Sequence, residues 1–157
     1  MNNIWKEIVN KLIESNSTIA TMESCTGGGI ANEITSVLGA SAVLKESYVT
    51  YCNEAKIKQG VPAYVIDKYS VYSAETAAEM AKAVKRQANS NIGIGVTGQL
   101  GRTDPNNPND KLNCVWYSII DNNDEIIVNM IKVPNADRKI QKDVVIAEIA
   151  NTLNEVI

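Results

Sequence analysis

Helix-like and strand-like segments alternate along the first half of the chain, and this order restricts the fold more strongly than any other feature. Apolar residues recur at helical spacing over residues 2–15. Residues 17–22 are short, apolar and β-branched, which is typical of a buried strand, and they lead into three consecutive glycines. The apolar residues that follow predict a second helix, which ends at Gly39. The chain therefore begins as helix, strand, glycine loop and helix.

A second strand and three helices are expected in the middle of the chain. Residues 46–52 alternate between polar and apolar types like a strand. Asn53 is a favourable N-cap for a short helix, and Pro62 opens another one at its first turn. Ser73 is the predicted cap of a longer helix over residues 74–88.

The last part of the chain contains a buried strand, a long loop, a hairpin and a closing helix. Residues 92–96 predict the strand, and the polar, proline-containing residues 97–111 predict the loop. Residues 112–120 and 125–133 flank a turn and predict a hairpin, and residues 136–156 predict the helix. Alternating elements followed by a hairpin favour a three-layer α/β/α sandwich with a mixed sheet.

Length and composition restrict the class of protein. The 157 residues suit one domain, 1–157, and 45% hydrophobic with 21% charged residues is typical of a soluble globule. The net charge of −3 argues against nucleic acid as a partner. The N-terminus lacks the apolar core of a signal peptide, and no apolar run is long enough to span a membrane. We therefore expect a cytoplasmic protein without a membrane partner.

The chain has no histidine, so neither a Ser-His or Cys-His pair nor a histidine metal ligand is available. Its three cysteines, Cys25, Cys52 and Cys114, are odd in number and never at C-x-x-C spacing. This pattern suits free thiols in a reducing compartment and argues against a disulfide framework or a zinc site.

Three loops follow the predicted strands at the edge where α/β sheets bind ligands: residues 23–29, 52–56 and 97–111. The glycines of the first loop let backbone N–H groups approach an anion or a developing oxyanion. The segment is neither a dinucleotide-binding fingerprint nor a P-loop. Glycines alone are equally typical of a tight strand-to-helix turn.

Ser24 and Lys56 are the candidate nucleophile and base. A serine needs a base, and without histidine the remaining choices are Lys, Tyr, Asp or Glu; Ser-Lys pairs are a known substitute for the triad. To act as a base, lysine must lose about 3 units of pKa, which burial and a position in the first turn of a helix would favour. The simpler interpretations are that Ser24 is a helix cap and Lys56 a solvated surface residue.

Other residues near these loops have competing interpretations. Cys25 is a rival nucleophile, since a thiol at a helix start has a lowered pKa, but a small buried thiol is commoner. Glu23 could orient Lys56 or ligand hydroxyls, or it could be a charge at a helix N-terminus. Arg138 opens the last helix, where a cation is disfavoured, and so indicates either an anionic partner or a surface ion pair.

Together these segments resemble one protein family. Residues 18–28, TIATMESCTGG, are very similar to the A-E-S-C-T-G-G segment of the CinA C-terminal domain family of nicotinamide-nucleotide amidohydrolases. Residues 49–56, VTYCNEAK, resemble its Y-S-N-E-A-K segment. Shorter matches to the family are Gly60-Val61-Pro62, Ser73-Ala74-Glu75, Val96-Thr97-Gly98, Val115-Trp116 and Asp137-Arg138.

The resemblance implies an α/β/α domain that hydrolyses the carboxamide of nicotinamide mononucleotide, without a metal or other cofactor, to nicotinate mononucleotide and ammonia. It implies that Ser24 is the nucleophile, Lys56 the general base and Tyr51 an assisting residue. The expected substrate-binding residues are Glu23, Cys25, Thr26, Gly27, Gly28, Thr97, Gly98 and Arg138. The resemblance is to stand-alone enzymes, which lack the pyrophosphatase-like domain of larger relatives.

The chain departs from the family pattern at three places: in the loop after residue 98, at residues 111–116, which read KLNCVW where the family has K-P-V-G-T-V-W, and at Ala136, where the family has glycine. Where the family has V-T-G-I-A-G-P-D-G-G, residues 96–105 read VTGQLGRTDP, so a proline is replaced by Arg102 and the glycine pair is lost. Two alternative hypotheses follow: a weak or inactive nucleotide-binding module, and an amidase for another small amide. We also expect a homodimer, because a small domain with a late hairpin has a free sheet edge.

Overall fold

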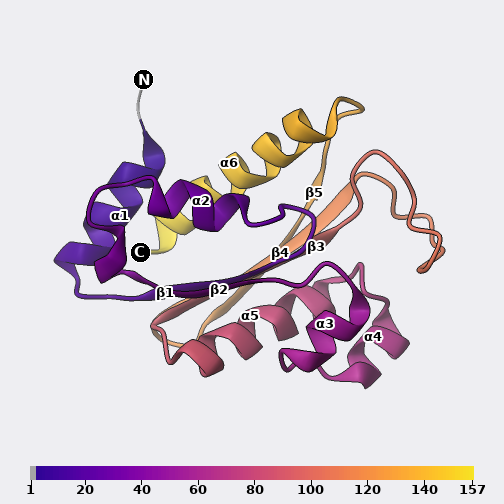
Figure 1. Cartoon of the computed structure of the whole chain (residues 1–157), viewed down its shortest axis with the longest axis horizontal. Helices are drawn as coiled ribbons and strands as arrows, with labels where there is room; N and C mark the ends of the chain where they lie inside the picture. The colour runs from indigo at the N-terminus through magenta and orange to yellow at the C-terminus, as the bar shows by residue number, and fades with distance from the viewer. Residues whose placement is uncertain (1–2) are drawn as a thin grey trace.

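The computed structural model describes residues 3–157. A mixed five-stranded sheet lies between two layers of helices, which gives three layers in all (Figure 1). The strands lie in the order β2-β1-β3-β4-β5. β1 pairs in parallel with β2 and β3, and β4 pairs antiparallel with β3 and β5. The predicted α/β/α sandwich with a mixed sheet is confirmed. The strand bounds are β1 (Ile19–Glu23), β2 (Leu44–Val49), β3 (Ile92–Gly98), β4 (Cys114–Ile120) and β5 (Ile126–Lys132).

Helices cover both faces of the sheet (Figure 1). One layer contains α1 (Ile4–Glu14), α2 (Gly29–Thr35) and α6 (Arg138–Val156), and the other α3 (Asn53–Lys58), α4 (Ala63–Tyr69) and α5 (Ala74–Ala88). On the first side, Trp5, Ile30 and Val145 belong to the larger apolar core. On the second side, Met22 and Met80 belong to a smaller one. Both faces of the central strands are therefore removed from water.

Two glycines in β3 let α5 lie directly on the sheet. A Cβ atom at Gly95 would lie 2.6 Å from the backbone nitrogen of Ala81, and one at Gly93 would lie 2.5 Å from the carbonyl oxygen of the same residue. Both distances are far shorter than a van der Waals contact. The absence of side chains at these two positions therefore sets the spacing between α5 and β3.

Most element bounds agree with the sequence predictions to within two residues, although residue 2 of the first predicted helix lies outside the described residues. The second helix is shorter than predicted, because α2 ends at Thr35 and a separate 3₁₀ turn, η1 (Ala40–Ala42), follows. The hydroxyls of Thr35 and Ser36 donate to the carbonyl oxygens of Ala31 and Asn32, at 2.8 and 2.6 Å. Such bonds compete with the helical pattern and favour its end.

Three further predictions need correction. β2 ends at Val49, not at residue 52, because the next carbonyl, of Thr50, accepts a bond from the Lys56 amine instead of continuing a strand ladder. β3 extends to Gly98, so the long loop begins two residues later than predicted. Asn53 is the first residue of α3, not its cap, and Cys52 holds the cap position.

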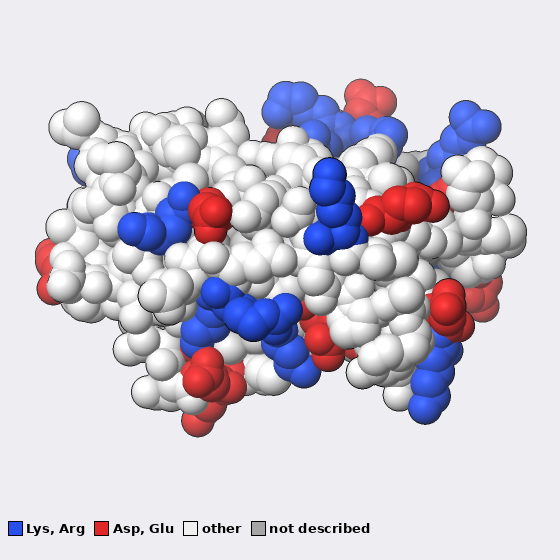
Figure 2. Space-filling model, turned by 60° about the horizontal axis from the view of Figure 1, so that its bottom comes forward, with Lys and Arg blue, Asp and Glu red and all other residues white. Residues whose placement is uncertain are grey.

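The face that α3, α4 and α5 cover carries mixed charge. Figure 2 shows Lys and Arg side chains interspersed with Asp and Glu on this face. Among residues 3–157, none of the helices is long and apolar enough to cross a membrane.

The close approach of α5 to β3 predicts a large effect of a single methyl group. We expect Gly95→Ala to lower the free energy of unfolding by about 2 kcal/mol, because the added carbon would overlap helix backbone that cannot move independently. Gly29→Ala is the matched control, since its added carbon would meet only the terminal methyl of Ile146. Urea denaturation of both variants measures the difference, and equal midpoints would contradict this account.

Candidate active site

The candidate site lies at the carboxyl ends of β1 and β3, beside the start of α3. Ser24 directly follows β1, and its backbone N–H donates to the carbonyl oxygen of Val96 in β3 at 3.1 Å. Its side chain is buried but lines a cleft of roughly 660 Å³. The sheet therefore fixes the backbone of Ser24 at the edge where α/β proteins bind ligands.

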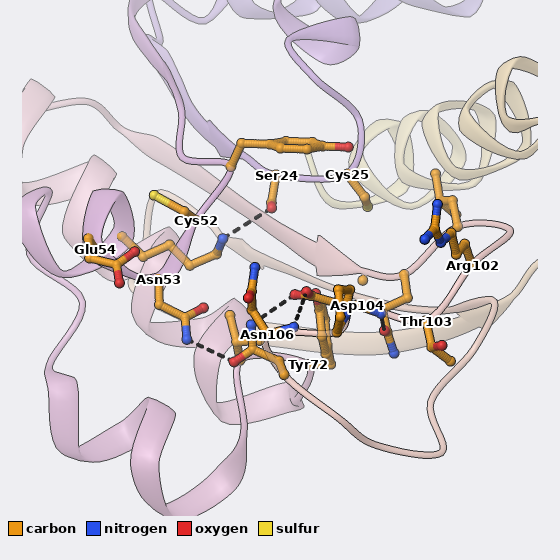
Figure 3. A pocket seen from close by; sticks show the side chains of 18 of the residues that line it. Ser24, Cys25, Cys52, Asn53, Glu54, Tyr72, Arg102, Thr103, Asp104 and Asn106 are labelled. Atoms are coloured by element: carbon orange, nitrogen blue, oxygen red, sulfur yellow. Dashed lines mark hydrogen bonds between the residues drawn. The ribbon is translucent and has the colours of Figure 1, made fainter.

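Lys56 of α3 forms a hydrogen bond with Ser24, which is the dashed line at Ser24 in Figure 3. Its Nζ atom lies 3.1 Å from Ser24 Oγ and donates to the carbonyl oxygen of Thr50 at 2.6 Å. The lysine is only 2% exposed. The predicted Ser-Lys pair is thus in hydrogen-bonding contact, and Lys56 is not a solvated surface lysine.

Burial lowers the pKa of Lys56 from 10.5 to about 8. None of the ion pairs among residues 3–157 includes this amine, and the negative charge of Asp104 opposes the shift only in part. The sequence argument from the helix dipole is wrong, because Lys56 lies in the last turn of the six-residue α3. Desolvation, and not the helix, lowers the pKa of the amine, so that a minor fraction is neutral near physiological pH and most of it is neutral above pH 8.

Tyr51 lies at the mouth of the cleft with 60% of its surface exposed. Its hydroxyl accepts a hydrogen bond of 2.8 Å from Nη2 of Arg138, the first residue of α6. Within the described residues Tyr51 makes no side-chain bond to Ser24 or Lys56. The structure therefore brings Tyr51 and Arg138 together beside the Ser-Lys pair.

Cys25 also lines the cleft, but it differs from an activated thiol. Burial raises its pKa to about 12. The helix start that was expected to lower this pKa lies four residues away, because α2 begins at Gly29. The Cys25 thiol is therefore protonated at neutral pH, which favours Ser24 as the nucleophile. Ser24 is not a helix cap either, since Gly28 holds that position.

Glu23 is fully buried and does not line the cleft. Its carboxylate accepts bonds from the hydroxyl of Thr26 at 2.6 Å and from the backbone N–H groups of Ile30 and Ala31 at 2.9 and 3.0 Å. It makes no bond to Lys56 within residues 3–157. Glu23 and Thr26 thus hold the glycine loop against the start of α2, which supports the helix-terminus interpretation of Glu23.

The glycine loop leaves backbone donors free beside Ser24. Gly27 and Gly28 have φ angles of 60° and 92°, a region that favours glycine. The N–H of Gly27 donates to the carbonyl oxygen of Ser24. Within residues 3–157, the N–H groups of Cys25 and Thr26 donate to no other backbone group and no side chain. Cys25 lines the cleft beside Ser24, so its N–H is a candidate donor to a ligand oxygen, whereas Thr26 is fully buried and does not line the cleft.

The two expected residues at the end of β3 differ in their surroundings. Gly98 lines the cleft, whereas Thr97 is fully buried and its hydroxyl donates to the carbonyl oxygen of Val71 at 2.9 Å. Thr97 therefore supports the cleft wall and does not face the cleft.

Sequence reasoning missed the residues that shape the opposite wall of the cleft. Asp104 accepts bonds from the Tyr72 hydroxyl at 2.6 Å and the Asn107 amide at 2.8 Å, as Figure 3 shows. Asn107 in turn accepts a bond of 2.9 Å from Asn53 of α3. Burial, followed by the bond to Asp104, raises the pKa of Tyr72 above its usual range. The Asn- and Asp-rich composition of this loop indicated turns but not these distant partners.

Gln99 organises the same loop from its base. It is 3% exposed, its Oε1 accepts from the N–H of Asp104 at 2.7 Å, and its Nε2 donates to Asn109 at 2.6 Å. The loop that departs from the family pattern is therefore a hydrogen-bonded wall. No group of three or more Cys, Asp or Glu residues among residues 3–157 is placed to hold a metal ion.

Comparison with known proteins identifies the family. Residues 1–156 match the CinA C-terminal domain family. The chain belongs to this family. A relative named "Putative competence-damage inducible protein" from Alkaliphilus metalliredigens is 47% identical over 95 residues, which cover 60% of this chain and 23% of the relative. A CinA-like protein from Kosmotoga olearia is 43% identical over 97 residues, which cover 61% of this chain and 24% of that relative. The chain thus aligns with about a quarter of these curated relatives.

Solved structures of the CinA superfamily have the same fold. The superfamily protein from Escherichia coli superposes with a TM-score of 0.89 at 23% identity, covering 99% of this chain and 89% of that chain. The superfamily protein from Klebsiella pneumoniae superposes with a TM-score of 0.88 at 22% identity, covering 99% of this chain and 97% of that chain. At this identity the likeness concerns the fold alone.

The buried amine of Lys56 predicts a pH-dependent stability. Because its pKa is about 8 in the folded chain and near 10.5 when unfolded, the unfolded chain binds more protons between these values. The stability of the wild type should therefore rise over this range, relative to Lys56→Met, by about 3 kcal/mol. Chemical denaturation at pH 7 to 10.5 measures the difference. Lys58 is exposed in the same helix, so the stability of Lys58→Met should change with pH as that of the wild type does. If the stability of Lys56→Met also followed the wild type over this pH range, burial would not lower the pKa of Lys56.

Proposed function

We propose that the chain hydrolyses the carboxamide of nicotinamide mononucleotide to nicotinate mononucleotide and ammonia, with Ser24 as nucleophile and Lys56 as general base. One observation carries the proposal: the Lys56 amine, with its pKa lowered to about 8, lies 3.1 Å from the Ser24 hydroxyl in an open cleft. Membership of the CinA C-terminal domain family supports the same class of reaction.

The first half of the reaction forms an acyl-enzyme. The neutral Lys56 amine accepts the proton of Ser24 Oγ, and the oxygen attacks the amide carbonyl carbon. The carbonyl oxygen becomes an oxyanion, which the free backbone N–H of Cys25 on the cleft wall stabilises. The C–N bond then breaks as the Lys56 ammonium donates its proton to the departing nitrogen, which leaves as ammonia.

The second half releases the acid. Lys56, neutral again, accepts a proton from water, and the resulting hydroxide attacks the acyl carbon. The ester bond to Ser24 breaks, and Lys56 returns the proton to Ser24 Oγ. The carbonyl of Thr50 holds the amine in position throughout, at 2.6 Å. Tyr51, fixed by Arg138 at the mouth of the cleft, assists by positioning the substrate.

The proposal also covers the cofactor, the oligomeric state and the cellular compartment. We expect the reaction to need no cofactor, and we expect the chain to work as a homodimer in the cytoplasm. Size-exclusion chromatography with light scattering tests the oligomeric state.

Replacing the nucleophile should abolish turnover. We expect Ser24→Ala to lower the rate of ammonia release from nicotinamide mononucleotide at least about 10³-fold, because no other hydroxyl is paired with Lys56. Ser36→Ala, at the exposed end of α2, provides the reference rate. If Cys25→Ala lost activity while Ser24→Ala retained it, the thiol would be the nucleophile and the proposal would fail. A panel of other small amides tests whether the altered loop has changed the substrate.

The pH dependence of the rate reports the base. Because only the neutral amine accepts a proton, kcat/KM should rise about tenfold per pH unit below pH 8 and level off above it. Steady-state kinetics between pH 6 and 9.5 measure the profile. A profile that stays flat from pH 6 to 8 would exclude Lys56 as the base.

A further inference from the structure

The cleft has a cationic end that the Ser-Lys chemistry does not use. Arg102 and Arg138 both line it. In the view of Figure 3, Ser24 lies between Glu54 at one end and Arg102 at the other. The reacting pair is thus flanked by opposite charges, and a bound molecule would have its anionic part on the side of Arg102.

The two arginines come from different elements but lie beside each other. Arg102 belongs to the loop after β3, and Arg138 is the first residue of α6. A Cβ atom at Gly101, the neighbour of Arg102, would lie 3.5 Å from Cγ of Arg138. The Arg138 stem therefore packs along the loop at the point where Arg102 begins.

Neither guanidinium forms an ion pair within the described residues. The ion pairs there involve only Lys82, Lys85 and Lys139. Arg138 donates to the neutral hydroxyl of Tyr51, and Arg102 makes no side-chain hydrogen bond within residues 3–157. Two neighbouring cations without an anion repel each other, and a bound dianion would relieve this repulsion.

Arg102 is also not needed to hold its loop. The hydrogen bonds that fix this wall involve Gln99, Asp104 and Asn107. The Asp104 carboxylate accepts hydrogen bonds from the neutral side chains of Tyr72 and Asn107, and it forms no ion pair with Arg102 among residues 3–157. The side chain of Arg102 is therefore free to bind a ligand, and its loss should not unfold the wall.

We infer that Arg102, paired with Arg138, binds the phosphate monoester of the substrate and sets the preference of this chain for phosphorylated over unphosphorylated amides. The inference rests on the proposed function for the identity of the amide. It assigns a specificity role to a residue that stands where the family segment has proline. Guanidinium groups suit this role because they bind phosphate oxygens through paired N–H donors.

Kinetics with two substrates test the role of Arg102. We expect Arg102→Ala to raise KM for nicotinamide mononucleotide about tenfold, with kcat within twofold, and to leave KM for nicotinamide riboside, which lacks the phosphate, within twofold. Arg102→Lys should recover part of the loss, and added salt should reduce the difference. Arg86→Ala, an exposed arginine on α5, is the matched control. An equal effect of Arg102→Ala on both substrates, or none on either, would overturn the inference.

Binding without turnover separates this inference from the proposed function. Calorimetry measures the Kd of nicotinamide mononucleotide for Ser24→Ala and for Ser24→Ala/Arg102→Ala. A Kd at least about tenfold weaker in the double variant supports the inference even if the wild type releases no ammonia, in which case only the proposed function fails. Equal Kd values, or no binding by either variant at millimolar ligand, would overturn the inference whatever the rate of turnover.

Discussion

The burial of one amine is the interaction on which the rest of this site depends. Lys56 is removed from water between the Ser24 hydroxyl and the Thr50 carbonyl. Taking an ammonium out of water is costly, and among residues 3–157 no carboxylate forms an ion pair with Lys56, so the charge of Asp104 compensates only in part. The amine instead approaches neutrality, with a pKa of about 8. The burial that lowers the stability of the fold is thus the same burial that, in the proposed reaction, lets Lys56 act as the base for Ser24.

The mixed sheet provides the rigid frame that makes this burial possible. β1 lies between β2 and β3, so the residues that follow β1 and β2 meet at one edge. The Glu23 carboxylate holds the glycine loop to the start of α2 from within the protein. Ser24 therefore has a fixed backbone, and the loop keeps the N–H of Cys25 free beside it. In the proposed reaction this donor needs no rearrangement when the oxyanion forms.

The loop after β3 is the part of the site in which this chain differs from the family segment. Side chains of Gln99, Asp104 and Asn107 hold this loop through bonds that reach α3 and Tyr72. The loop and the Ser-Lys pair thus belong to different elements of the cleft. In the proposed function, a change in this wall would alter the preferred substrate and leave the Ser-Lys pair unchanged.

The sequence by itself determined the order of elements and the mixed sheet, because periodicity and turn residues are local signals. Its resemblance to the family indicated Ser24 and Lys56 as the two residues of the proposed reaction. Only the tertiary structure decided which side chains face the cleft. Thr97 and Glu23 turn away from it because their polar atoms bond within the core, whereas Arg102 and Asp104 contribute to its far wall. Val71, the partner of Thr97, lies 26 residues away along the chain, and Asp104 binds Tyr72 across 32 residues, so local sequence patterns do not predict these contacts.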